Sequence, residues 1–144
     1  MKFTARLLVI FLLIVALFVS ASAHEGREVG EYVINFGWRN EPAYPTLLNG
    51  PELTVVTHDD ETPVEGLTDT LKIEVAYGGK TKVLRLRAVF GSPGHYTADL
   101  IPTQPGDYSF HLTGTIGDVT VDEVFDSAEG EFNSVDPISD IQFP

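Results

Sequence analysis

The stretch Leu71-Lys72-Ile73-Glu74-Val75-Ala76-Tyr77-Gly78-Gly79 decides the fold of this chain. Apolar side chains recur at every second position, with Lys72 and Glu74 between them, which is the period of a β-strand that has one buried face. Gly78-Gly79 then provides the two-residue turn of a β-hairpin, because glycine readily takes positive φ at both positions. The stretch therefore predicts one strand of an antiparallel sheet.

The same alternation recurs along most of the chain, and no stretch shows sustained helical periodicity. Turn sequences such as Ser92-Pro93-Gly94 and Pro105-Gly106-Asp107 separate the alternating segments. The expected strands cover residues 32–38, 53–58, 71–77, 84–90, 95–100, 108–113 and a last strand that begins at Val119. Short strands without helices predict an all-β protein, a seven-stranded immunoglobulin-like β-sandwich.

Tyr108 follows the turn Pro105-Gly106-Asp107, where the chain is expected to cross between the two sheets. This position resembles the tyrosine corner of immunoglobulin-like sandwiches, in which the hydroxyl bonds back to the backbone a few residues upstream. The alternative is that Tyr108 is an ordinary aromatic side chain of the core.

The N-terminus has the three parts of a secretory signal peptide. Lys2 and Arg6 form a positive region, residues 7–19 are an unbroken apolar run, and Ala21-Ser22-Ala23 provides the small residues of a cleavage site. We therefore expect residues 1–23 to be removed and the protein to be exported to the periplasm, the cell surface or the medium. If cleavage did not occur, the leader would serve as an N-terminal membrane anchor. The chain has no Cys, so an exported domain must be stabilised by its core without disulfides.

The mature chain is expected to form one sandwich domain over residues 24–126, followed by an acidic extended tail at 127–144. Loss of Lys2 and Arg6 with the leader changes the formal net charge from −12 to −14. So acidic a protein is not expected to bind nucleic acid or anionic lipid, because both require a basic surface. We expect a monomer or a weakly associating protein.

Three of the four histidines are expected at one end of the sandwich. In an immunoglobulin-like order, three strands would be antiparallel neighbours in one sheet, at 32–38, 53–58 and 95–100. This arrangement brings His24, His58 and His95 together as candidate metal ligands. The free amine and imidazole of His24, with two further imidazoles, suit Cu(II) better than Zn(II). The alternative is that these are separate, solvated histidines at strand ends.

The sequence contains no recognisable catalytic motif. It has no Cys nucleophile, Ser92, Ser109 and Ser127 lack a G-x-S-x-G setting, and no H-E-x-x-H is present. No nucleophile, base and orienting group can be named together, so we expect a protein that is not an enzyme.

The segment 39–51 holds three prolines and is expected to be a structured loop. Trp38, just before this loop, and Tyr44, within it, could form an aromatic contact patch for a protein partner. The alternative is that this loop packs as a cap over the end of the sandwich. Partner binding without a metal is therefore the second functional hypothesis, beside copper binding or delivery.

Several segments of the sequence resemble those of a group of small, uncharacterised exported prokaryotic proteins. These segments are the start of the mature chain, His24-Glu25, the run Gly37-Trp38-Arg39-Asn40-Glu41-Pro42-Ala43-Tyr44, and the run from Pro93 to Pro102 with Pro105-Gly106-Asp107-Tyr108. The sandwich is distantly similar to periplasmic copper carriers of the copper-resistance type, which also begin with His after the signal. The resemblance implies an exported sandwich and suggests copper, although Met1 is the sole methionine and the Met-rich segment of those carriers is absent.

Overall fold

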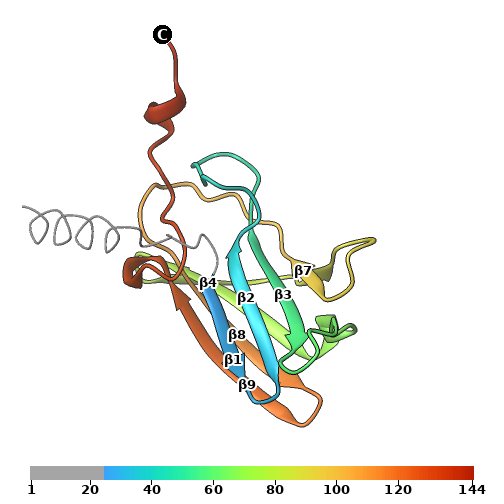
Figure 1. Cartoon of the computed structure of the whole chain (residues 1–144). Coiled ribbons are helices and arrows are strands. Elements are labelled where there is room, and N and C mark those ends of the chain that lie inside the picture. The colour runs from blue at the N-terminus through green and yellow to red at the C-terminus, as the bar shows by residue number, and fades with distance from the viewer. Residues whose placement is uncertain (1–24) are drawn as a thin grey trace, which may run out of the picture.

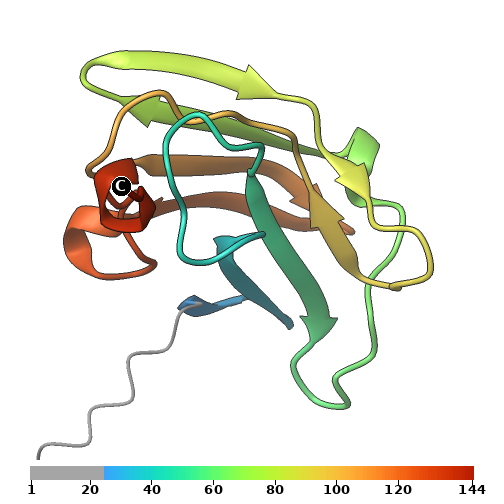
Figure 2. The same cartoon turned by 90° about the horizontal axis from the view of Figure 1, so that it is seen from above.

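The computed structural model describes residues 25–144, which form two antiparallel β-sheets packed face to face (Figures 1 and 2). This architecture confirms the expected all-β sandwich. The signal peptide expected at 1–23 and the candidate ligand His24 lie outside the described residues. Among residues 25–144, no helix is long and apolar enough to cross a membrane.

One sheet has five strands in the order β1-β2-β3-β7-β6. Their bounds are β1 (Glu25–Val29), β2 (Tyr32–Trp38), β3 (Pro51–Thr57), β7 (His95–Thr97) and β6 (Arg87–Ala88). The expected neighbours 32–38, 53–58 and 95–100 do share this sheet, as β2, β3 and β7.

The other sheet has four strands in the order β5-β4-β8-β9. Their bounds are β5 (Lys80–Leu84), β4 (Leu71–Tyr77), β8 (Ser109–Ile116) and β9 (Val119–Asp126). Three 3₁₀ turns complete the described chain, namely η1 (Leu67–Asp69), η2 (Ser127–Glu129) and η3 (Ile138–Ile141).

The two sheets bury a cluster of aromatic side chains between them. Phe36 stacks on Phe125 with ring centroids 4.3 Å apart, and Trp38 meets Phe110 edge-on at 5.3 Å. Phe132, from the segment after the last strand, packs against Phe36 at 5.5 Å. Truncating a buried aromatic side chain to Ala typically costs about 3–5 kcal/mol, so this cluster is a main source of stability for a domain without disulfides.

One expected strand is wrong. Residues 84–90 do not form a single strand, because β5 ends at Leu84 and β6 spans Arg87–Ala88 in the other sheet. Leu84 and Leu86 are both buried, but their alternation marks the crossing between the sheets, and Phe90 is fully exposed in the turn that follows β6. The described residues form nine strands where seven were expected, since β1 and β5 were not anticipated.

Tyr108 forms the tyrosine corner that the sequence predicts. Its hydroxyl donates a 3.0 Å hydrogen bond to the backbone carbonyl of Gln104, four residues upstream, and its ring lies 4.5 Å from the ring of Tyr77. Burial raises the pKa of the Tyr108 hydroxyl, which therefore stays protonated and able to donate this bond.

The two long sides of the sandwich differ. On one side, Arg27 of β1 reaches the neighbouring edge strand β9, where its Nη1 donates to Glu123 Oε2 at 3.0 Å and to the Val124 carbonyl at 2.7 Å. Its guanidinium also pairs with Glu131 and lies 4.7 Å from the centre of the Phe125 ring. On the other side, β5 ends the four-stranded sheet, and within residues 25–144 no strand pairs with its outer edge.

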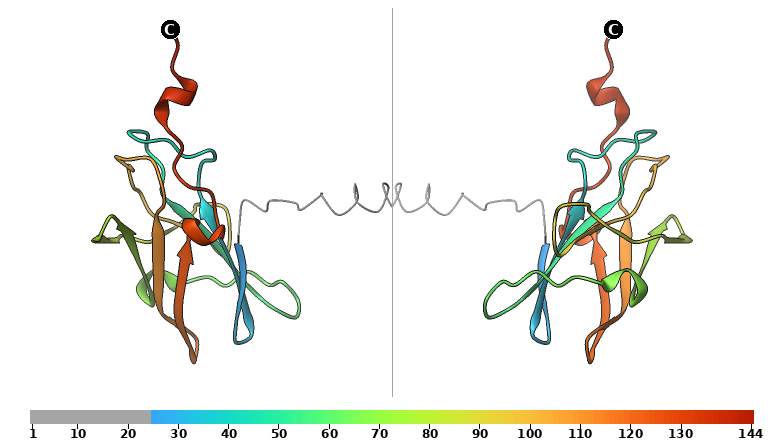
Figure 3. Two further views of the ribbon diagram at one scale, coloured as in Figure 1. Left: turned by 90° about the vertical axis from the view of Figure 1, so that its left-hand side faces the viewer. Right: turned by 90° about the vertical axis from the view of Figure 1, so that its right-hand side faces the viewer.

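The C-terminal segment 127–144 has two parts. As far as Val135 it packs on the sandwich, because Phe132 and Val135 are buried and Val135 exchanges backbone hydrogen bonds of 2.8 and 2.9 Å with Gly106. After Asp136 the chain leaves the domain and projects past the end of the sandwich (Figures 1 and 3).

Candidate functional site

His58 lies immediately after β3, beside the β1–β2 turn. Its backbone N–H donates to the Glu31 carbonyl at 2.8 Å, its Nε2 lies 3.4 Å from Glu28 Oε1, and its Nδ1 lies 3.4 Å from Asp59 Oδ1. The hydrogen bond with Asp59, followed by the charge of Glu28, raises the pKa of the His58 imidazole. A metal ligand must be neutral imidazole, so this setting favours the protonated form that does not bind metal.

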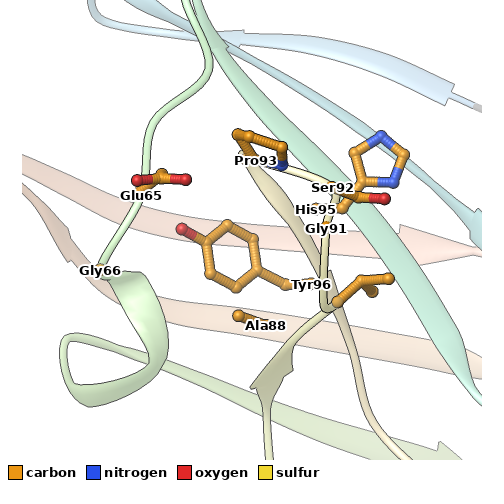
Figure 4. Close-up of a pocket in the computed structure, with 10 residues that line it drawn as sticks. Glu65, Gly66, Ala88, Gly91, Ser92, Pro93, His95 and Tyr96 are labelled. Atoms are coloured by element: carbon orange, nitrogen blue, oxygen red, sulfur yellow. The ribbon is translucent and has the colours of Figure 1, made fainter.

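His95 begins β7, where it is paired in register with Thr54 of β3. Its Nδ1 lies 3.5 Å from Glu52 Oε1. Residue 95 borders a pocket of about 360 Å³ that Glu65 and Tyr96 also line, but its imidazole points away from these two side chains (Figure 4). His58 is four positions beyond Thr54 along the same strand direction, which places the two histidines about 13 Å apart along the sheet. Each imidazole faces its own carboxylates.

The described residues do not gather a three-ligand metal site. Within residues 25–144, no group of three His, Asp or Glu side chains could hold an ion together. The described chain begins at Glu25, opposite Phe36, whereas His58 lies beside the other end of β2 near Tyr32. His111, on the other sheet, pairs with Asp122 at 2.6 Å. A copper site of His24, His58 and His95 therefore stays a prediction that this arrangement of described residues does not favour.

Trp38 does not belong to a contact patch. It is buried in the core, and its Nε1 donates a 2.8 Å hydrogen bond to the Asn133 carbonyl. Burial therefore removes Trp38 from the expected patch of Trp38 and Tyr44, whereas Tyr44 is half-buried. Partner binding through this loop stays a prediction.

Asn49 fixes the shape of the loop between β2 and β3. Its buried side chain accepts a 3.0 Å hydrogen bond from the Asn40 backbone N–H and donates a 2.9 Å bond to the Asn40 carbonyl. Arg39 Nη2 also donates to the Asn49 carbonyl at 2.7 Å. The loop is thus held at its base, so the residues at its tip keep a defined position.

The tip of this loop and its neighbours expose apolar side chains. The Thr46 N–H donates to the Pro102 carbonyl at 2.7 Å, so the loop lies against the segment around Ile101. The C-terminal segment leaves the domain beside Ala43, whose carbonyl accepts a 2.8 Å bond from Asp136. All three segments lie at one end of the sandwich (Figures 1 and 3). We call this surface the apolar end, and its exposed side chains are Leu47, Leu48, Ile101, Ile141 and Phe143.

The apolar end concentrates the exposed apolar surface of the domain. Eight large apolar side chains are exposed within residues 25–144, and five of them are at this end. Leu48 is 60% exposed and Phe143 is 97% exposed. The segments 40–49 and 128–144 contain no Lys or Arg, whereas Asp136 and Asp140 are exposed beside the apolar residues. The sequence does contain a signal for this surface, namely the pair Leu47-Leu48 inside a proline-rich loop that cannot be a strand.

Comparison of the chain with family models, curated proteins and solved structures found no match.

Proposed function

We propose that the mature protein is an exported, non-catalytic binding domain that holds a protein partner at the apolar end. The observation that carries this proposal is the exposure of Leu47, Leu48 and Ile101 on loops that hydrogen bonds hold in place, with Ile141 and Phe143 exposed on the tail at the same end. Contiguous exposed apolar surface on a soluble domain commonly marks an interaction site. The β-sandwich serves as the scaffold, and the loops provide the contact.

The charge around this surface supports a particular kind of partner. Asp136 and Asp140 lie within the tail, and the loop at 40–49 contains no Lys or Arg. A partner that presents apolar side chains flanked by Lys or Arg would complement both features. Its contacts would centre on Leu47, Leu48 and Ile101, which lie on the parts of the end fixed to the sandwich.

A photo-crosslinking side chain at Leu48 tests this proposal in the cells that make the protein. Thr120 is the matched control position, because it is exposed near the β8–β9 turn at the opposite end of the sandwich (Figure 1). We expect a discrete protein adduct from position 48 and none from position 120. Adding Leu47→Ser and Ile101→Ser should remove the adduct while thermal unfolding stays cooperative. Equal labelling from both positions, or labelling from neither, would contradict the proposal.

A further inference from the structure

Most of the few cations of this acidic domain lie on the side of the sandwich where β5 ends the four-stranded sheet. Residues 25–144 contain seven Lys and Arg side chains. Five of them lie between the start of β4 and the end of β6, namely Lys72, Lys80, Lys82, Arg85 and Arg87. Arg87 is paired with Asp99 at 3.0 Å, and within the described residues the other four form no ion pair.

Lys80 and Lys82 lie on the face of β5 that is directed toward the interior of the sandwich. They are paired in register with Tyr77 and Val75, and with Ile101 they line a groove of about 180 Å³ between the strand and the crossing loop. Lysines directed inward on an edge strand discourage pairing with apolar or cationic strands. The same side chains would attract a strand that presents carboxylates on this side.

The backbone of β5 has free hydrogen-bonding groups on its outer side. Gly78 and Gly79 have φ of 55° and 76°, as in a two-residue hairpin turn, so Tyr77 and Lys80 form the hydrogen-bonded pair that closes the hairpin. Hydrogen-bonded and non-bonded pairs alternate along an antiparallel ladder. The N–H and C=O groups of Thr81 and Val83 therefore face away from β4, toward solvent.

We propose that the outer edge of β5 accepts an extended acidic peptide segment of another protein as a fifth strand of this sheet. Backbone groups of Thr81 and Val83 would form the ladder, in the manner of β-strand addition. Carboxylates at alternate positions would meet Lys80 and Lys82, and apolar residues between them would pack on the exposed Val83. Ile101 belongs both to this groove and to the apolar end, but the proposed ladder depends on Thr81 and Val83, which the apolar end does not include. Either proposal can therefore fail without the other.

The overall negative charge of the protein does not prevent this contact. The acidic strand β9 is at the far edge of the same sheet, three strand spacings from β5, or about 14 Å. Charges at that distance are largely screened at physiological salt, where the Debye length is about 8 Å. Glu74 of β4 is nearer, but it is paired with Val83 on the face of the sheet opposite to Lys80 and Lys82. Carboxylates directed to the inner face of the edge would therefore meet the two lysines.

The test uses a capped peptide of alternating Glu and Val as the probe for the full mature protein. We expect saturable binding, with slower amide hydrogen exchange at Thr81 and Val83. Val83→Pro removes an outward N–H without removing a β4 bond, and should weaken binding about tenfold or more, whereas Val83→Thr keeps the N–H and should change it little. Lys80→Glu with Lys82→Glu should abolish binding of the Glu-Val peptide and permit binding of a Lys-Val peptide.

Two results would overturn the proposal. The first is equal binding of a Glu-Val peptide whose alternate amides are N-methylated, because that peptide cannot form the ladder. The second is equal affinity for unstructured polyglutamate or for vesicles of anionic phospholipid, because simple charge attraction would then explain the binding. Self-association of the protein through β5, lost in Val83→Pro, would also contradict an acidic partner.

Discussion

Gly50 shows at the scale of one residue how the loop beneath the apolar end is built. It has φ of 146°, and a Cβ atom added there would lie 1.7 Å from the Ala98 carbonyl oxygen. The backbones of the loop and of the segment before Ile101 therefore approach as closely as they do because residue 50 has no side chain. Asn49 is buried beside it, so the pair Asn49-Gly50 fixes the corner.

Gly50→Ala should destabilise the protein by about 3 kcal/mol or more, since the backbone must move to relieve the clash. Gly66→Ala is the matched control, because Gly66 also has positive φ but open space around its Cβ position, and it should cost about 1 kcal/mol. Urea unfolding of both variants measures the difference. Equal costs at the two positions would show that the close approach does not matter.

Asp99 is a second residue that supports this end of the fold. Its Oδ1 accepts hydrogen bonds from Arg39 at 2.8 Å and from Arg87 at 3.0 Å, and these bonds, with Arg39 first, lower the pKa of the Asp99 carboxyl. A lowered carboxyl pKa adds stability that is present above the ordinary value of about 3.9 and is lost as the pH falls through the lowered value.

Asp99→Asn should therefore reduce the free energy of unfolding at neutral pH and make no difference in strong acid. The difference between wild type and variant should begin to shrink below about pH 4, as the carboxyl gains its proton. Chemical unfolding at a series of pH values measures it. A difference that stays constant down to about pH 2 would contradict the ion pair.

At the scale of elements, period-2 alternation predicted the strands that have one buried face. The alternation did not predict the edge strands β1 and β5. All of Lys80 to Val83 are exposed, so β5 has almost no apolar alternation, and β1 is similarly polar. Leu84 and Leu86 alternated for another reason, because both face the core where the chain changes sheets.

The same physics explains which site residues the sequence could predict. Trp38 follows Ile34 and Phe36 at two-residue spacing, so the alternation already placed it on the buried face, although its aromatic character suggested an interface. The distance between His58 and His95 depends on strand register, which alternation does not specify. β7 pairs with residues 52–54 in the first half of β3, whereas His58 follows the end of β3, and this offset separates the two histidines.

The C-terminal segment provides a test of how the elements share the core. A chain that stops after Asp136 keeps every buried residue, so its stability should change by less than about 0.5 kcal/mol. A chain that stops after Glu131 loses Phe132 and Val135 and should be destabilised by about 3–5 kcal/mol or more. Thermal and urea unfolding compare the two. A large loss from the shorter truncation would show that residues 137–144 pack on the domain in solution.

At the scale of the whole molecule, charge and apolar surface are segregated. Five of the seven cations within residues 25–144 lie between the start of β4 and the end of β6, and five of the eight exposed large apolar side chains lie at the apolar end. Arg27 links β1 to β9 on the side opposite β5. This distribution suits a domain that holds other chains through separate faces. It is harder to reconcile with a metal carrier, because the described histidines each face their own carboxylates.

Native mass spectrometry of the mature protein, released intact from the cells that make it, compares the two hypotheses in one spectrum. The proposed function predicts a complex with one polypeptide partner that disappears in the variant carrying Leu47→Ser and Leu48→Ser, with no change on adding a copper chelator. A spectrum of the single chain carrying one copper ion, lost in a form with an extra residue before His24 and unaffected by the leucine substitutions, would contradict it.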